Sequence, residues 1–154
     1  LHLGRLMSDE VVCLVAEDHP AVRQPRSWTA DRYLDSEHIA PAALYEGARG
    51  IIDEQLQVQG LTRRIAVQAA HFSLIPHMVA RTRLVLTTGR QFCSRVAADL
   101  PVQTVRCPVP LPPMAYYQLW HERGHRAASL KWLREQVRDV ARELTLVPAR
   151  ARGR

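Results

Sequence analysis

Apolar and polar residues between Arg63 and Cys107 follow two periods that alternate along the chain. Strand period comes first, with every second side chain apolar, and helical spacing follows it. The apolar positions are Ile65, Val67 and Ala69 at strand period, Phe72, Ile75, Met78 and Val79 at helical spacing, Leu84–Leu86 in a short run, Phe92, Val96 and Leu100 four apart, and Val102 and Val105 in a last short run. Strands that alternate with helices of this length predict parallel strands joined by helical crossovers.

The residues before this block predict two further strands and two helices. Glu10–Ala16 is nearly all apolar, which is typical of a strand covered on both faces. Thr29 is placed to cap a short helix over Ala30–Leu34, and His38–Pro41 has the pattern of a strand that proline stops. Ile51–Gln59 predicts a helix that the following glycine ends in the left-handed conformation.

A proline-rich stretch, Cys107–Pro113, separates these elements from the end of the chain. Its four prolines remove backbone donors and favour an extended linker. Met114–Trp120 then predicts a strand, and Ser129–Leu144 predicts a strongly amphipathic helix, while residues 147–154 predict a disordered tail. The apolar stripe of the helix consists of Leu130, Leu133, Val137, Val140 and Leu144. A chain that leaves one lobe, builds a second and returns has the topology of a two-lobed binding protein with a cleft between its lobes.

The composition is that of a globular protein, with 47% apolar and 23% charged residues. No apolar run is long enough to span a membrane, and no secretory signal is visible at the start, so we expect a cytoplasmic protein without a membrane partner. The three cysteines are widely spaced and odd in number, which predicts reduced thiols rather than a disulfide framework. A net charge of +6 keeps nucleic acid open as a partner, but the arginines are scattered and no helix-turn-helix pattern is evident.

Two turns in the alternating block form the predicted binding region, because ligands of such sheets sit beyond the carboxyl ends of the strands. At the first turn, the imidazole of His71 and the free N–H groups of the following helix suit a carboxylate or a phenolate. Phe72 could pack on an aromatic ligand, and Ser73 is placed to cap the helix. The structural alternative puts Phe72 in the core, leaves His71 in solvent and gives Ser73 only the cap.

The second turn contributes Thr88 and Arg90, whose hydroxyl and guanidinium groups could hold an anion. The alternative is that Thr88 caps the next helix and Arg90 is solvated. His38 lies in the predicted strand His38–Pro41 and is a further candidate for a ligand contact, although a lone histidine is more often structural. We therefore predict ligand contacts at these positions, with no catalytic residue, no cofactor and no metal.

His121-Glu122-Arg123-Gly124-His125 matches H-E-x-x-H, the pattern of zinc proteases. That chemistry needs both histidines on one face of a helix, with the glutamate as general base. The residues before the motif have a strand pattern and a glycine lies inside it, so a surface loop is the favoured interpretation. A zinc hydrolase stays open as an alternative function. No glycine-rich phosphate loop, G-x-S-x-G elbow or CxxC pair is present, so nothing else in the sequence argues for an enzyme.

Several short blocks carry a family resemblance, namely Leu6–Pro20, Ile52–Gln68, Phe72–Arg90 and Pro108–His121, followed by Trp132-Leu133-Arg134. In this order they resemble the effector-binding domain of LysR-type transcriptional regulators, in particular the subgroup that answers nodulation flavonoids and aromatic acids. The resemblance extends to about Val137. It implies an α/β fold of the periplasmic-binding-protein-like type 2 class, with two lobes, parallel or mixed sheets and two crossovers. It also implies a small organic effector between the lobes, a homo-oligomer and a cytoplasmic transcription factor.

The chain departs from the family pattern in two ways. The winged helix-turn-helix is missing, so we expect DNA contact only through a domain absent from this chain. The strand, helix and strand with which the effector domain normally opens are also missing before Leu6, so we expect an incomplete first lobe. The expected division gives residues 1–37 to lobe one with the strand at 10–16, 38–107 to lobe two, and 108–146 to the return into lobe one. A solute-binding receptor of a transport system shares the fold and is a further alternative.

Overall fold

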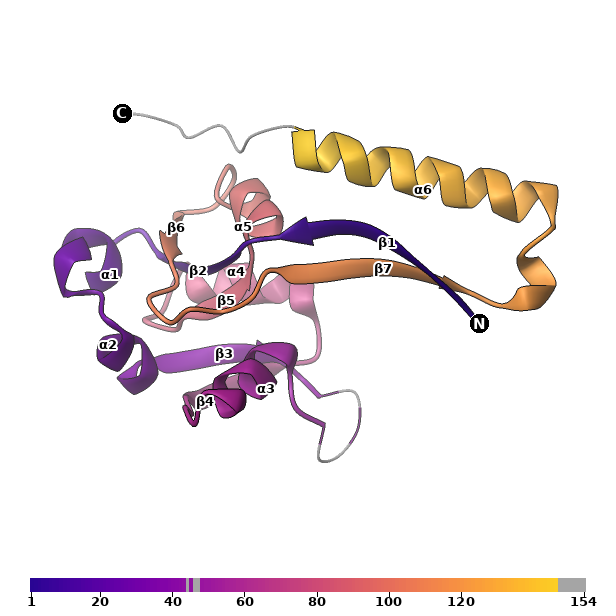
Figure 1. Cartoon of the computed structure of the whole chain (residues 1–154). Coiled ribbons are helices and arrows are strands. Elements are labelled where there is room, and N and C mark those ends of the chain that lie inside the picture. Colours follow the sequence, from indigo (N-terminus) through magenta and orange to yellow (C-terminus); the bar gives the residue numbers. More distant parts are fainter. Residues whose placement is uncertain (44, 46–47, 147–154) are drawn as a thin grey trace. The chain divides into compact units, whose positions relative to one another are not determined.

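The computed structural model describes residues 1–43, 45 and 48–146, and the predicted tail at 147–154 lies outside the described residues. The chain divides into two compact units. Unit 1 contains Leu1–Asp9 and the chain from Pro113 onward, and unit 2 contains Glu10–Pro112. Figure 1 labels the helices and strands of both units along the chain.

The three-stranded sheet of unit 2 has β2 (Val11–Ala16) at its centre. This strand pairs antiparallel with β5 (Leu86–Gly89) on one side and with β6 (Val102–Arg106) on the other. All six residues of β2 are buried, which explains why this segment is nearly all apolar. Since both neighbours run opposite to β2, β5 and β6 are parallel to each other.

A second sheet of unit 2 consists of the parallel strands β3 (Glu37–Pro41) and β4 (Arg64–Ala69). The helix α3 (Ile51–Val58) lies between them in the chain, as parallel neighbours require. A single parallel bridge joins His38 of β3 to Val85, directly before β5. The predicted alternation between Arg63 and Cys107 is confirmed, since β4, β5 and β6 run in one direction with α4 (Ile75–Val79) and α5 (Arg90–Val96) between them, whereas the antiparallel β2 makes the strand arrangement of unit 2 mixed.

Short helices connect the other strands of unit 2, namely α1 (Pro20–Arg23), η1 (Pro25–Ser27), α2 (Ala30–Asp35), η2 (Phe72–Leu74), α4 (Ile75–Val79) and α5 (Arg90–Val96). The side chain of Thr29 caps α2 by accepting a hydrogen bond from the Arg32 amide, as predicted. Gly60 follows α3 with a φ of 71°, which is the left-handed conformation predicted for that position.

The hydrophobic core of unit 2 joins strands β2, β3, β5 and β6 to α4 and α5. Its buried members are Val12, Leu14, Ile39, Ile75, Val79, Leu84, Leu86, Cys93 and Val102. The predicted face of Phe92, Val96 and Leu100 packs against this cluster, although α5 itself ends at Val96. The core therefore fixes the positions of the turns that follow β4 and β5.

The proline-rich connection after β6 runs without a helix or strand to β7 (Met114–Trp120). Val109 within it is buried, and the side chain of Gln59 donates a hydrogen bond to the carbonyl of Pro110 over 2.9 Å. Thus the predicted linker is partly anchored to unit 2. Among the described residues, no helix has both the length and the apolar character needed to cross a membrane.

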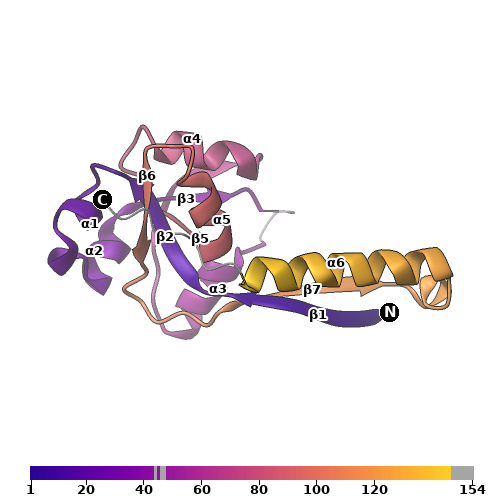
Figure 2. The same ribbon diagram turned by 90° about the horizontal axis from the view of Figure 1, so that it is seen from above.

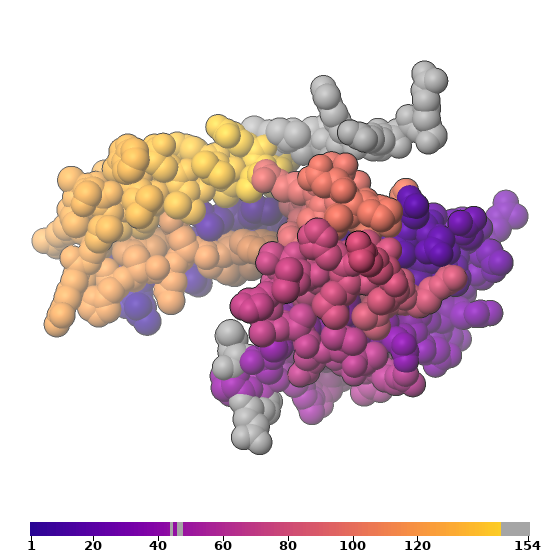
Figure 3. Space-filling view, turned by 180° about the vertical axis from the view of Figure 1, so that it is seen from behind, coloured from indigo at the N-terminus to yellow at the C-terminus, as the bar shows by residue number. Residues whose placement is uncertain are grey.

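Unit 1 is a two-stranded antiparallel ribbon of β1 (His2–Asp9) and β7, with a helix along one face (Figures 1 and 2). A turn of 3₁₀-helix, η3 (Glu122–Gly124), follows β7 and leads to the long helix α6 (Ala128–Leu146). In Figure 3 the yellow atoms of α6 lie alongside the orange atoms of β7. The predictions of β7 and α6 are confirmed, but β1 was not predicted from the sequence.

The apolar stripe of α6 is exposed in the structure. Leu130, Leu133, Val137 and Val140 have exposed fractions between 39% and 56%. The helix reaches the ribbon in part through Arg134, whose guanidinium carbon lies 4.9 Å from the centre of the Trp120 ring. The amphipathic pattern thus predicted the helix correctly but not the side that contacts the ribbon.

The structure corrects the expected lobe assignment of the strand at 10–16. We expected this strand to lie in lobe one beside Met114–Trp120, but β2 forms the centre of unit 2 and β7 pairs with β1. Burial gives the physical reason: β2 is covered on both faces, as the central strand of a packed sheet must be. Unit 2 therefore begins at Glu10 rather than at residue 38.

Candidate ligand-binding site

Several strand ends of unit 2 meet at one edge, which we call the carboxyl edge. It carries the carboxyl ends of β3, β4 and β5, because β3 is parallel to β4 and bridged in parallel to the chain that enters β5. It also carries the start of β2 and the end of β6, since β2 is antiparallel to β5 and β6. Glu10, His71, Arg90 and Arg106 lie at these strand ends. Both turns predicted from the sequence are therefore at the same edge.

Arg90 and Glu10 form the central ion pair of the carboxyl edge. Arg90 Nε donates to Glu10 Oε2 over 2.7 Å, and the Arg90 amide donates to the Glu10 carbonyl over 2.9 Å. The hydrogen bond from Arg90 holds the pKa of Glu10 below its usual value, and the charge of Arg106 acts in the same direction. Arg90 is therefore held in place at the start of α5 rather than free in solvent.

The first predicted turn places His71 and Ser73 in solvent and Phe72 partly inside. His71 precedes η2 and is exposed, and Ser73 lies exposed within η2. Phe72 is half-buried against the core, with its ring centre 4.6 Å from that of Phe92 on α5. The predicted cap by Ser73 is wrong, because α4 begins after Leu74 and has no side-chain cap.

Thr88 does not cap α5 either. It is buried within β5, where it pairs with Val12, and the capping position of α5 is taken by Gly89 without a side-chain hydrogen bond. The neighbouring hydroxyl of Thr87 is also buried and makes a 2.9 Å hydrogen bond with the Tyr33 hydroxyl. The strand thus continues three residues further than the sequence pattern suggested, to Gly89 rather than Leu86.

His38 lies inside unit 2 and not at the carboxyl edge. Its side chain is fully buried in β3, with Nε2 donating to the Tyr33 carbonyl over 2.8 Å and Nδ1 accepting from Arg63 Nη1 at 3.5 Å. Burial lowers the pKa of His38 to about 4, and the charge of Arg63 adds to the effect. The geometry favours the structural alternative for this histidine.

Glu10 and Arg106 are members of the edge that sequence reasoning missed. Both lie at the ends of predicted strands, Glu10 before β2 and Arg106 as the last residue of β6. The sequence contained a signal for Arg106, since it follows an apolar run and precedes the proline-rich linker. The position of Glu10 required the antiparallel direction of β2, which the pattern of apolar residues does not reveal.

The H-E-x-x-H motif does not form the helix that zinc chemistry needs. Residues Glu122–Gly124 form η3, the carboxylate of Glu122 pairs with His2, and Trp120 Nε1 donates to His125 Nδ1 over 3.2 Å. Within the described ranges, no group of three or more histidine, cysteine, aspartate or glutamate side chains is arranged to hold a metal ion. The arrangement therefore does not support the zinc hydrolase.

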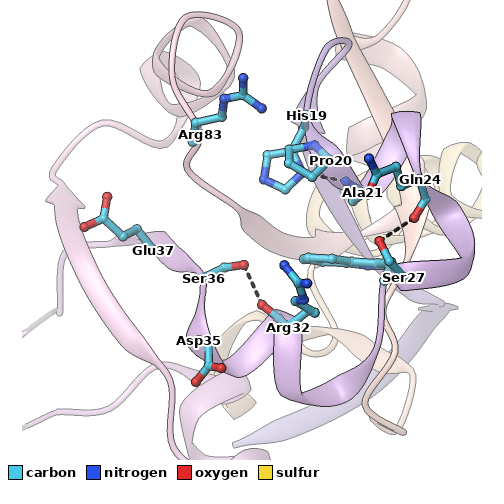
Figure 4. A pocket seen from close by; sticks show the side chains of 11 residues that line it. His19, Pro20, Ala21, Gln24, Ser27, Arg32, Asp35, Ser36, Glu37 and Arg83 are labelled. Carbon is cyan, nitrogen blue, oxygen red and sulfur yellow. Dashed lines mark hydrogen bonds between the residues drawn. The ribbon is translucent and has the colours of Figure 1, made fainter.

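A separate hollow of about 430 Å³ lies at the opposite ends of the strands (Figure 4). It is bordered by α1, η1 and α2, by the first residue of β3, and by the loop before β5. The side chains that give it chemical character are His19, Trp28, Arg32, Asp35, Glu37 and Arg83. The sequence analysis assigned no ligand contact to these residues.

The model of the LysR substrate binding domain matches residues 1–142. The chain belongs to this family. It is 29% identical over 136 residues to the transcriptional activator NahR of Pseudomonas putida, covering 88% of this chain and 44% of NahR. It is 31% identical over 137 residues to the transcriptional regulator SyrM of Rhizobium meliloti, covering 89% and 41%. The chain thus spans less than half the length of these relatives, which are regulators and not enzymes.

Solved structures of the family share the fold of this LysR domain. A transcriptional regulator from Vibrio parahaemolyticus matches with a TM-score of 0.76 at 24% identity, over 94% of this chain and 66% of that chain. The effector binding domain of QuiR in complex with shikimate matches with a TM-score of 0.67 at 16% identity, over 92% and 66%. The BenM effector binding domain with benzoate matches with a TM-score of 0.66 at 12% identity, over 96% and 66%. The predicted periplasmic-binding-protein-like α/β fold is confirmed.

Proposed function

We propose that this LysR domain senses a small organic carboxylate, aromatic in character, at the carboxyl edge of unit 2. The observation that carries the proposal is the meeting of Arg90, Arg106 and His71 at one set of strand ends, next to the half-buried ring of Phe72. Ligands of open α/β sheets bind beyond the carboxyl ends of the strands. Two guanidinium groups against one carboxylate leave this edge with an excess of positive charge for an anion.

The ion pair with Glu10 orients the guanidinium of Arg90 at the carboxyl edge. A guanidinium has five donors in a planar fork, so the 2.7 Å contact to Glu10 fixes the plane in which Arg90 meets a ligand carboxylate. Phe72, packed on Phe92, offers the exposed part of its ring to an aromatic effector. Benzoate and shikimate, the ligands of two similar structures, each combine a carboxylate with a six-membered ring, which agrees with this pairing of charge and ring.

Regulation by this domain would follow from differential binding. An effector that binds one of two conformations more tightly shifts the population toward it, and the shift changes contacts made elsewhere in the regulator. We propose that DNA binding belongs to a part of the regulator outside this chain. The homo-oligomer, the effector position between two lobes and the cytoplasmic location stay predictions.

Titration of the ¹⁵N-labelled chain with benzoate, followed by NMR, tests the proposal. We expect saturable amide shifts at residues 70–73 and 88–91, and Arg90→Gln should weaken binding about tenfold because a charge-assisted hydrogen bond is lost. Arg95→Gln is the matched control, since Arg95 is an exposed arginine in the last turn of the same helix. Equal binding of benzyl alcohol, which lacks the carboxylate, or an unchanged affinity of the Arg90 variant would contradict the proposal.

A further inference from the structure

The hollow in Figure 4 carries charged groups of both signs around one aromatic wall. Arg83 and His19 lie on one side of it, and Arg32 and Ser36 face them from α2 and the residue after it. Asp35 and Glu37 also border the hollow, with the Glu37 carboxylate at its rim and the Asp35 carboxylate turned away from Arg83 and His19. The volume of about 430 Å³ lies within the range of roughly 300 to 1,000 Å³ that is typical of small-molecule sites.

Arg32 and Arg83 present hydrogen-bond donors to the hollow. Arg83 Nη1 lies 3.4 Å from the Asp18 carbonyl, and Nη2 lies 3.9 Å from the Asp18 carboxylate, so both contacts are long for hydrogen bonds. Arg32 is exposed, and no ion pair of its side chain occurs among the residues that the structure describes. Guanidinium groups on two sides of a hollow suit a carboxylate ligand, since each presents a planar fork of donors.

Two acidic side chains, Asp35 and Glu37, border the hollow beside Ser36. The carboxylate of Glu37 pairs with Arg64, which leaves its second oxygen able to accept a further hydrogen bond. Asp35 is exposed in the last turn of α2, beside the hollow. A ligand that carried only negative charge would be repelled from this side, whereas a cationic group would be attracted.

Trp28 gives the hollow a rigid apolar wall. Its Nε1 donates to the Arg106 carbonyl over 3.0 Å, and its ring makes edge contacts with His19 at 5.7 Å and Tyr33 at 6.1 Å between ring centres. His19 is buried, and burial lowers its pKa, so this side chain adds no positive charge at neutral pH. The charged groups of the hollow are therefore balanced between two arginines and two carboxylates.

We propose that this hollow binds a small zwitterionic amino acid with an apolar side chain. Its carboxylate lies between Arg32 and Arg83, its ammonium group lies toward the rim at Glu37, and its side chain packs on Trp28. The site is separate from the carboxyl edge, because Glu37 begins β3 and Arg83 precedes β5, which places both at the other ends of the strands. Because Trp28 Nε1 donates to the Arg106 carbonyl of that edge, phenylalanine binding is also measured in the Arg90→Gln variant, where a Trp28 shift reports on the hollow alone.

Titration with L-phenylalanine, followed at the tryptophan indole resonances of the ¹⁵N-labelled chain, tests the proposal. We expect a saturable shift of the Trp28 indole, while Trp120 and Trp132 of unit 1 serve as internal controls that do not respond. Two matched ligands test the contribution of each charged group to binding. 3-Phenylpropanoate lacks the ammonium group, and phenethylamine lacks the carboxylate. Each should bind at least about tenfold more weakly than phenylalanine, the loss expected for one missing charged contact.

Variants test the assigned residues. Arg32→Gln and Arg83→Gln should each weaken phenylalanine binding about tenfold or more, because each removes one charged fork from the carboxylate. Arg26→Gln is the control, since Arg26 is an exposed arginine of η1 that does not border the hollow. An unchanged Trp28 resonance in each variant without ligand shows that the fold is intact. The absence of any Trp28 shift, or equal binding of phenylalanine and 3-phenylpropanoate, would overturn the proposal.

Discussion

Arg63 and Asp53 form a bidentate ion pair inside unit 2, with Nε 2.7 Å from Oδ1 and Nη2 3.0 Å from Oδ2. The pair joins the first turn of α3 to the residue before β4, and only 3% of the Arg63 side chain is exposed. Burial acts to lower the pKa of Arg63, but its hydrogen bonds to Asp53, the charge of Asp53 and the interactions with Tyr33 together outweigh burial, so the net pKa is raised. The guanidinium therefore stays charged in the interior.

We expect Asp53→Ala to lower the free energy of unfolding by about 3 kcal/mol, because it leaves the buried guanidinium of Arg63 without its partner. Urea unfolding, followed at the Trp28 indole resonance of unit 2, measures the loss. Arg64→Ala is the matched control, since the ion pair of Arg64 with Glu37 is exposed and should be worth less than about 1 kcal/mol. Similar losses for the two variants would show that the Arg63 pair is not buried in solution.

The buried ring of His38 makes the stability of unit 2 depend on pH. Its pKa is about 4 in the folded chain and about 6.5 in an unfolded one. Between these values the unfolded chain binds more protons, so the free energy of unfolding rises with pH over this window. We expect a loss on the order of 3 kcal/mol as the pH falls from about 7 to below about 4. Urea unfolding at a series of pH values gives the slope.

A variant identifies the group behind that slope. His38→Gln removes the titrating ring, so the rise in stability between about pH 4 and pH 6.5 should be reduced, whatever the variant costs at neutral pH. His77→Gln is the matched control, because it removes an exposed histidine of α4 from the same unit. A slope that is the same in the His38 variant as in the unsubstituted chain would assign the pH dependence to other groups, among them the buried His19.

Local patterns predicted the elements of this domain well where one segment carries the whole signal. Each of three local signals is confirmed by the structure. They are the six apolar residues of β2, the threonine that caps α2 and the glycine that follows α3. By contrast, β1 has a register irregularity between Arg5 and Met7, and both Leu6 and Met7 are half-buried. Such a bulge interrupts the alternation by which a strand is recognised.

The candidate site was predictable only as a set of turns. Topology placed His71 and Arg90 near the carboxyl ends of strands, and the structure puts those turns at one edge. The buried state of His38 could not be predicted, because it depends on Arg63 and on the bridge to Val85, which are 25 and 47 positions away. Long-range pairing of this kind leaves no periodic trace in the sequence.

The hydroxyl of Tyr33 gives another test of the interior. It lies 2.9 Å from the Thr87 hydroxyl in a buried environment, and burial raises the pKa of Tyr33, so the phenol stays protonated. Tyr33→Phe should lower the free energy of unfolding by about 1 to 2 kcal/mol, because the Thr87 hydroxyl loses a buried partner. Tyr117→Phe is the control, since Tyr117 is half-exposed on β7 and should cost little. Equal losses in the free energy of unfolding for the two variants would show that the Tyr33 hydroxyl is exposed to solvent.

Two leucines compare the core of unit 2 with the open stripe of α6. Leu14 in β2 has no exposed surface, whereas Leu133 on α6 is 50% exposed. Leu14→Ala should lower the free energy of unfolding by about 2 to 5 kcal/mol, because it leaves a cavity in a packed core.

Leu133→Ala should cost less than about 1 kcal/mol, because it removes little buried surface and alanine is the better helix former. Urea unfolding measures both variants, with the Trp28 indole reporting on unit 2 and the Trp120 indole on unit 1. A large loss for the Leu133 variant would mean that the stripe is covered in solution. In that case dilution of the protein should reduce the difference between the variant and the unsubstituted chain, if the cover is a second molecule. A small loss at all protein concentrations agrees with the exposed stripe of the structure.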